Sequence, residues 1–139
     1  MNKRTLRALT HLREQERQAA QQVWQQGQDR LSRMQQLQTQ LHQAQQTMQT
    51  SGAIDPATLR MRQQFGARLD FALRSGRSQL KAQDQITEEQ REALRHRHQQ
   101  TLIARKLTAR EQTLRAAQQL RSEERQLDDF SSARHGRFA

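Results

Sequence analysis

One helix-breaking segment interrupts an otherwise continuous helical pattern. Pro56 is the only proline of the 139 residues. It follows Asp55, a favourable N-cap residue, and so occupies the first helical position, where its fixed φ suits a helix and its missing N–H is not needed. Gly52 lies where a C′ glycine would end the preceding helix. The chain therefore predicts one helix over about residues 3–50, a turn at 51–55 and a longer helix over about 56–130.

Apolar residues recur at steps of three and four in both predicted helices, which is the pattern of a coiled-coil seam. If the helices fold back at the turn, Leu41 meets Phe65 and Leu37 meets Leu69, so apolar residues face each other. The sequence therefore predicts an all-α fold, a long antiparallel two-helix coiled-coil hairpin in a single domain. The expected seam consists of Ala20, Val23, Gly27, Leu31, Met34, Leu37, Leu41, Ala44 and Met48 against Phe65, Leu69, Ala72, Leu73, Gly76 and Leu80.

The two predicted helices differ in length, about 70 Å against about 110 Å at 1.5 Å per residue. The second helix is expected to extend past the first from Leu102 onward, with apolar stripes that need a partner or a fold-back. A fold-back would form a three-helix bundle with a break at residues 74–78, around Gly76, or at 84–90, where Thr87 begins a capping-box spacing. Residues 131–139 lack periodicity and are expected to form a flexible tail.

The composition favours an extended helical protein over a globular or disordered one. Hydrophobic residues make up 32% of the chain and aromatic residues 4%, too few for an ordinary globular core. Proline and glycine are scarce, and the bulk consists of good helix formers. There is no cysteine, which excludes disulfides and thiolate metal sites. Apolar runs do not exceed three residues, so no membrane span is expected, and the protein is predicted to be soluble and cytoplasmic.

No residue pattern for catalysis is present, so neither an enzyme nor a bound cofactor or metal is expected. His96 and His98 are two positions apart and would point to different faces of a helix. The net charge of +10 is compatible with nucleic-acid binding, but basic residues alternate with acidic ones, as on a solvated coiled-coil surface. Residues 2–13 are basic and contain Leu6, Leu9 and Leu12. This segment suits either an anionic membrane surface or packing on the second helix, and we favour packing.

The ordered motifs of the chain resemble those of the FliJ/YscO family, the stalk proteins of bacterial type III export ATPases in flagella and injectisomes. The resemblance covers nearly the whole chain. It rests on the opening Leu6-x-x-Leu9-x-x-Leu12-x-Glu14-x-Glu16 run, Ala19-Ala20, Val23-Trp24, the glutamine-rich Leu37/Leu41 stretch, Gln64-Phe65-x-x-x-Leu69-x-x-Ala72, and Asp129-Phe130 before a small basic tail.

The resemblance implies a non-enzymatic stalk of the flagellar export apparatus, peripheral to the inner membrane. Its chain ends would enter the hexameric export ATPase, promote ring assembly and activity, and meet the regulator of the ATPase. Its turn end would contact the membrane export gate, and export chaperones would also bind. No nucleic acid and no direct membrane insertion are implied. The alternatives are the equivalent stalk of a virulence injectisome, and a generic coiled-coil scaffold or homodimer.

Two sets of contact residues follow from these expectations. Exposed apolar side chains near both chain ends form the candidate ATPase-ring contact, and the resemblance places the export-gate contact near the turn. The ring set is Leu6, Leu9, Ile103, Leu107, Leu114, Leu120, Leu127 and Phe130, and the gate set is Leu37, Leu41, Ala44, Met48, Phe65, Leu69, Ala72 and Gly76.

Overall fold

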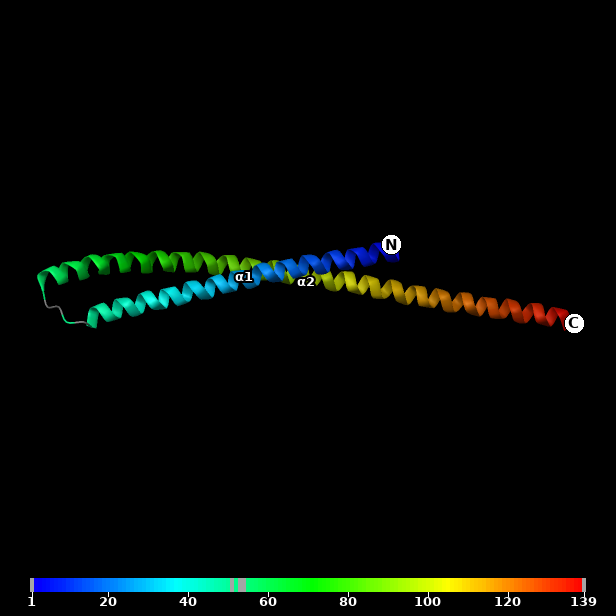
Figure 1. The fold of residues 1–139 in the computed structure, drawn as a ribbon. Coiled ribbons are helices and arrows are strands. Elements are labelled where there is room, and N and C mark those ends of the chain that lie inside the picture. Colours follow the sequence, from blue (N-terminus) through cyan, green and yellow to red (C-terminus); the bar gives the residue numbers. More distant parts are fainter. Residues whose placement is uncertain (1, 51, 53–54, 139) are drawn as a thin grey trace. The chain divides into compact units, whose positions relative to one another are not determined.

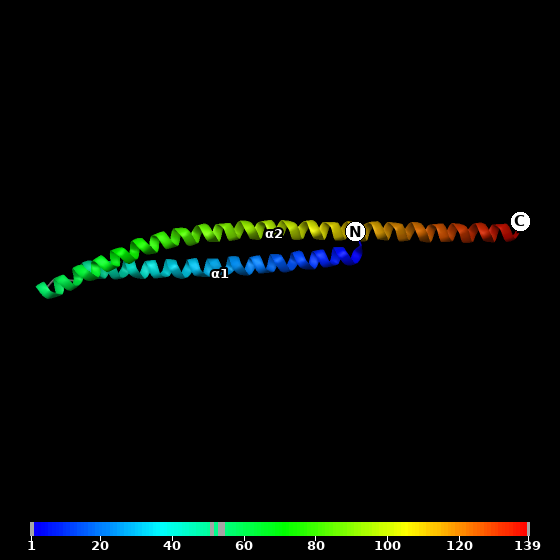
Figure 2. The same cartoon turned by 90° about the horizontal axis from the view of Figure 1, so that it is seen from above.

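The computed structural model describes residues 2–50, 52 and 55–138, and both longer segments are helical except at their first residues, Asn2 and Asp55. Helix α1 spans Lys3–Thr50 and helix α2 spans Pro56–Phe138. The helices pack against each other as an antiparallel hairpin whose second helix is the longer, as both views show (Figures 1 and 2). The predicted fold class is confirmed. Ser51, Ala53 and Ile54 of the predicted turn, and Ala139 of the predicted tail, lie outside the described residues.

Each helix starts directly after a residue that suits the N-cap position. In α2 the first backbone hydrogen bond runs from Leu59 N to the carbonyl of Asp55, at 2.8 Å, so Pro56 occupies the position that needs no donor. In α1 the carbonyl of Asn2 accepts from Leu6 N at 3.0 Å. Both helices therefore begin directly after an Asx residue, which is a favourable N-cap.

Helix α2 is continuous, so the three-helix alternative is wrong. Residues 74–78 and 84–90 are helical, and the Thr87 hydroxyl donates to the carbonyl of Gln83 at 2.9 Å instead of capping a new helix. A single glycine inside a helix costs only about 1 kcal/mol, which neighbouring packing overcomes at Gly76. The helix also continues through residues 131–138, where a tail was expected.

The chain divides into two compact units, residues 18–96 and residues 1–17 with 97–139. In the first, called the central unit, most buried and half-buried residues of each helix follow each other at alternating steps of three and four, as in a coiled coil. This seam consists of Ala20, Trp24, Gly27, Leu31, Met34, Gln38, Leu41, Gln45 and Met48 on α1, and of Gly66, Leu69, Leu73, Gly76, Leu80, Gln83, Thr87, Gln90 and Leu94 on α2.

The seam of α1 differs from the predicted one at three positions. Val23 and Leu37 were expected to face α2, but 47% and 57% of their surfaces are exposed, and Trp24 and Gln38 take their places. Gln45 likewise replaces Ala44 in the alternation. The apolar path from Leu31 through Met34 to Leu37 needs two successive steps of three, which overwinds a coiled coil. The strict alternation avoids this, although it buries glutamine.

The register also differs from the predicted one. Gln38 lies against Gly76, and Met48 Cε lies 3.9 Å from the position of a Cβ on Gly66. Both pairs sum to 114 (38 + 76 and 48 + 66), so Leu41 faces Leu73 and not Phe65. The predicted pairing of Leu41 with Phe65 is therefore wrong by eight residues (73 − 65).

Glycines opposite long side chains account for this register. The Gln38 amide reaches across at Gly76 and donates from Nε2 to the carbonyl of Leu73 at 2.9 Å. At Gly27 the absent side chain leaves room for Gln90 and Thr87. A helix interior admits a long polar side chain only where its partner is small and a hydrogen-bonding group is within reach. Glycine thus marks contact positions that an apolar pattern leaves unrecognised.

We expect Gly66→Ala to stabilise the hairpin and Gly76→Ala to destabilise it. Neither glycine has a positive φ, so alanine gains roughly 0.5–1 kcal/mol of helix propensity at both sites. At Gly66 the new methyl group meets only ordinary contact, whereas at Gly76 it collides with the Gln38 amide, and a buried amide that loses its partner costs about 1–3 kcal/mol. Thermal unfolding followed by circular dichroism measures both. In a Gln38→Ala background, Gly76→Ala should become stabilising, and equal shifts in both backgrounds would contradict the packing.

The second unit, called the terminal unit, pairs the start of α1 with the later part of α2. Its interior holds Leu6, Ala104 and Thr101. The Thr101 hydroxyl donates to the carbonyl of Arg13 at 3.1 Å, and the hydroxyls of Thr10 and Thr108 lie 2.9 Å apart. In this unit, hydrogen bonds of threonine hydroxyl groups therefore join the helices in addition to a few apolar contacts.

Beyond Glu111 every residue of α2 up to 134 is exposed. We call residues 112–134 the uncovered segment, and in both views the red end of α2 continues past the start of α1 (Figures 1 and 2). The extension was expected from Leu102 onward. It begins later because the register shift moves the paired part of α2 toward its C-terminus.

Candidate functional site

Two edges flank the seam of the central unit, and they differ in chemistry. In an antiparallel coiled coil the rows beside the seam lie edge to edge on the two helices. One edge, called the apolar edge, carries mostly apolar side chains, namely Val23, Leu37, Ala44, Phe65, Ala72, Ile86 and Ala93, with Arg30 and Gln79 between them. The other, called the polar edge, consists of Gln21, Gln28, Gln35, His42, Gln49, Gln63, Asp70, Arg77, Asp84 and Arg91.

The large side chains of the apolar edge are exposed although they are hydrophobic. Val23, Leu37, Phe65 and Ile86 each show about half of their surface to solvent. A row of apolar side chains along one face of a helix pair, with a polar face opposite, is typical of a surface that binds another protein. The apolar edge is therefore the candidate interaction surface of this unit.

The structure divides the predicted gate residues between the seam and this edge. Leu69 is buried, and Leu41, Met48 and Gly76 are half-buried within the seam. The remaining four form one stretch of the apolar edge, and they are Leu37, Ala44, Phe65 and Ala72. This second group can meet another protein without opening the hairpin.

Sequence reasoning missed Ile86 as an edge residue and assigned Val23 to the seam. The signal was present: Ile86 lies three heptads after Phe65, and Val23 lies three heptads before Ala44. Recognising them requires the correct seam, because the same residues become core positions if the seam is moved by one residue.

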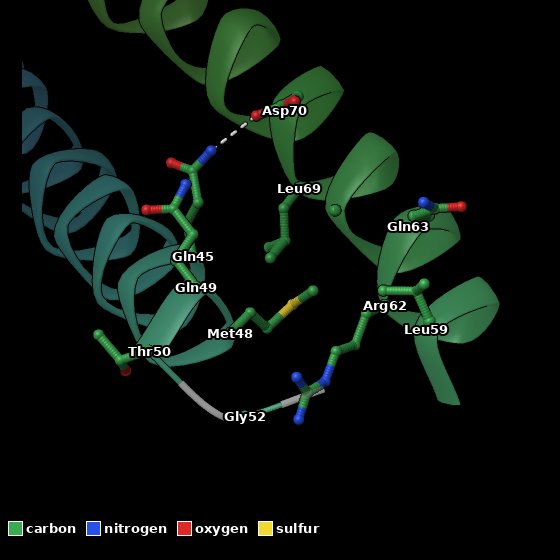
Figure 3. Close-up of a pocket in the computed structure, with 11 residues that line it drawn as sticks. Gln45, Met48, Gln49, Thr50, Gly52, Leu59, Arg62, Gln63, Leu69 and Asp70 are labelled. Atoms are coloured by element: carbon green, nitrogen blue, oxygen red, sulfur yellow. Dashed lines mark hydrogen bonds between the residues drawn. The ribbon is translucent and has the colours of Figure 1, made fainter. Parts of the chain in front are cut away.

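Grooves lie on both sides of the helix pair near the turn. The one on the apolar-edge side is lined by Met48, Met61, Phe65, Arg62 and Arg68, with Thr58 and Gln64. In the other, Met48 and Leu69 point into the space between the helices, and Gln45 Nε2 donates to Asp70 Oδ1 at 2.7 Å (Figure 3). Neither groove contains a cluster of titratable groups arranged for catalysis. Both are open surfaces suited to protein contact.

In the terminal unit, most of the predicted ring residues are exposed. Leu6 is buried, with 4% of its surface exposed, and Leu9 is half-buried, so the start of α1 packs on α2 as we favoured. Ile103 and Leu107 are exposed beside this packing. The uncovered segment bears the rest, namely Leu114, Leu120, Leu127 and Phe130.

A cluster of charged residues holds the start of α1 against α2. Glu16 pairs with Arg97 across the helices at 2.9 Å and with Arg13 at 3.1 Å. Glu14 pairs with Arg17 at 2.6 Å and with Arg105 across the helices at 3.1 Å. Each carboxylate thus joins an arginine of its own helix to one of α2, which orients the helices in a region with few apolar contacts.

We expect acid to weaken this cluster through Glu14. The hydrogen bond from Arg17 lowers the pKa of Glu14 below its ordinary value of 4.5, against desolvation, and the charges of Arg17, Arg105 and His98 lower it further. Because the folded pKa lies below the unfolded one, its stabilising effect is present above the unfolded pKa and is lost as the pH falls through the folded pKa. The melting temperature of Glu14→Gln should therefore change less between pH 6 and pH 2 than that of the wild type.

The matched control is Glu92→Gln, which removes an exposed carboxylate paired with Arg95 at 3.5 Å within one helix. Its pH profile should follow that of the wild type. Coinciding profiles for the wild type and Glu14→Gln would show that the cluster does not contribute to the acid response.

Within the described residues, no group of three or more histidine, aspartate or glutamate side chains is arranged to hold a metal ion. No described helix combines the length and the hydropathy that crossing a bilayer requires.

The chain was compared with known families, curated proteins and solved structures. A family model described as flagellar FliJ protein matches residues 2–138. No curated protein and no solved structure matches the chain.

Proposed function

The chain belongs to the flagellar FliJ protein family, a family of non-enzymatic components of the flagellar export apparatus, and from this premise we propose that it acts there as a stalk. In this proposal the terminal unit enters the hexameric export ATPase, and the turn end of the central unit contacts the membrane export gate. The stalk promotes assembly and activity of the ring, while the chemistry of ATP hydrolysis belongs wholly to the partner. The flagellar description of the family favours this system over an injectisome.

The observation that carries the proposal is the uncovered segment of α2. It exposes Leu114, Leu120, Leu127 and Phe130 without any covering helix. Binding of a partner over these side chains is favoured by roughly 25 cal/mol for each Å² of apolar surface that is removed from water. The lumen of a ring can surround a single helix on all sides, which suits apolar residues that point in several directions.

Arginines offer a second kind of contact, although the uncovered segment carries four arginines and four acidic residues. Arg110 and Arg121 are exposed on and beside this segment, whereas Arg115 pairs with Glu111 at 3.1 Å and Arg105 pairs with Glu14 at 3.1 Å. Acidic loops lining a ring would pair with them and would accelerate association more than they would raise the final affinity.

In the central unit, the apolar edge supplies the proposed gate contact. Leu37 and Phe65 are its most exposed large residues near the turn, with Ala44 and Ala72 beside them. Export chaperones and the regulator of the ATPase are further proposed partners. We place the protein in the cytoplasm, at the inner face of the export apparatus, on the ground of its family.

The test is co-purification with the export ATPase of the same organism, together with ATP hydrolysis measured at increasing concentrations of the chain. Binding with stimulated hydrolysis is the expected result. Failure to bind the ATPase hexamer would overturn the ring part of the proposal.

Gate binding is tested separately. Leu37→Asp with Phe65→Asp should abolish capture by the cytoplasmic domain of the gate protein. The control, Gln35→Asp with Gln63→Asp, adds the same charges on the polar edge and should leave capture intact. Equal capture of both variants would remove the apolar edge from the gate contact.

A further inference from the structure

The seam of the central unit is poorer in apolar residues than the row beside it. On α1, Gln38 and Gln45 face α2, while Leu37 and Ala44, one residue earlier, lie on the apolar edge. Gln83 and Thr87 are buried in the same seam. Buried polar side chains contribute less than apolar ones to a coiled coil, and they weaken the preference for one packing over others.

A second seam is available without any change of chain direction. In this second seam, every second contact position of the observed seam is kept, among them Met34, Leu41, Leu69 and Gly76. Each of the other contact positions is replaced by the residue that precedes it in the sequence, which lies on the apolar edge. The move corresponds to a rotation of each helix by about 50° about its own axis, half the angle between successive residues at 3.5 residues per turn. The backbone slides by only about one residue, roughly 1.5 Å.

The alternative contacts are complementary in size. Leu37 would lie opposite Gly76, and Ala44 opposite Leu69, so large residues would face small ones. Further along, Gly27 would receive Ile86. Packing of large against small residues is what an interdigitated helix interface requires. The size match is confined to these layers, because the second seam also brings Arg30 and Gln79 into the interface and keeps Gln83 and Gln90 there.

An independent observation shows that the observed seam is not fully satisfied. Trp24 Nε1 and Gln90 Oε1 are buried in the same layer, and neither has a hydrogen-bond partner among the described residues. A buried polar group without a partner costs about 1–3 kcal/mol. In the second seam Trp24 moves from the centre to the flank, where its indole N–H can meet water. Against this relief, Leu31, Leu73, Leu80 and Leu94 leave the centre, so the observed packing is the more populated of the two.

We propose that the central unit exchanges between two packings, the observed seam and one in which the apolar edge rotates into the interface. In the observed packing the apolar edge is open to a partner, and in the second it is closed by the hairpin itself. A partner that binds the edge would select the first packing, because a ligand shifts an equilibrium by its differential affinity for the two states. The proposal holds whichever protein binds there, and it stands apart from the stalk function.

The test uses pairs of cysteines, since the wild-type chain contains none. Ala44→Cys with Ala72→Cys joins the two helices across the apolar edge, and Gln35→Cys with Arg77→Cys joins them across the polar edge. The two pairs are symmetric about the observed seam (44 + 72 = 116 and 35 + 77 = 112, against 114 for the seam pairs). A static hairpin therefore oxidises both at similar rates. Rotation brings the first pair together and separates the second, so exchange predicts a several-fold faster disulfide at the apolar edge.

Trp24 supplies a second readout, because it is the only tryptophan in the chain. Leu37→Gln disfavours the second packing, and Gln38→Leu favours the observed one. Both should reduce quenching of Trp24 fluorescence by acrylamide, with far-UV circular dichroism as the check that the helices remain. In a static hairpin the exposed Leu37 has no influence on Trp24. Equal oxidation rates at the two edges, or quenching unchanged by Leu37→Gln, would overturn the proposal.

Discussion

Leu120→Asp with Leu127→Asp is expected to abolish stimulation of the export ATPase while leaving the hairpin folded. Both leucines are exposed, lie one heptad apart on one stripe of the uncovered segment, and contact no part of α1. Burying a leucine side chain in a partner is worth about 1.5–3 kcal/mol, and aspartate removes that gain. Together the two changes should weaken binding to the ring by roughly 10²–10⁴-fold. Titration of ATP hydrolysis against the variant measures the loss.

The control is Gln118→Asp with Ser122→Asp, which places the same charges on the opposite side of the same segment, again at exposed positions. We expect this pair to retain most of the stimulation. If both variants lost stimulation of ATP hydrolysis equally, the loss would follow from the added negative charge, and the apolar stripe would have no specific role.

Leu73→Ala should be among the most damaging substitutions for the hairpin itself. Only 2% of Leu73 is exposed, and its carbonyl accepts the bond from Gln38 at the centre of the seam. Removing a buried leucine to alanine costs about 2–5 kcal/mol, and the thin interface between two helices places the expected value near the lower end. Thermal unfolding followed at 222 nm should show a melting temperature lower by roughly 5–15 °C.

Phe71→Ala is the matched comparison, two residues away on the same helix. It removes a larger side chain, but 75% of Phe71 is exposed, so the expected change is within about 0.5 kcal/mol. A larger effect at Phe71 than at Leu73 would mean that this part of α2 packs through a different face.

Much of the fold could be predicted because its signals are local. Asp55 and Pro56 define the start of α2, and the long run of helix formers before and after them needs no tertiary contact to be recognised. The antiparallel arrangement follows from a short connection between two amphipathic helices. The apolar residues of the uncovered segment were also identified correctly as exposed, since α1 is too short to reach them.

The phase and the register of the seam could not be predicted in the same way. Leu37 is a better core residue than Gln38 when each is judged alone, and Leu41 with Phe65 is a better pair than many that occur. The choice was made by contacts between distant residues: Gln38 with Gly76 and with the carbonyl of Leu73, and Gln90 with Gly27. A prediction from hydrophobic periodicity considers only apolar residues, so it does not include a glycine that leaves space for the amide of a glutamine.

The amino-acid sequence by itself determined that this chain forms two unequal helices, where they are joined, and to which family they belong. Only the tertiary structure decided which side of each helix faces inward, and hence that Leu37 and Phe65 are open to a partner while Leu69 is not. The physical reason is that helix formation depends on neighbours in sequence. The facing of two helices instead depends on a sum of weak contacts between residues far apart in the sequence.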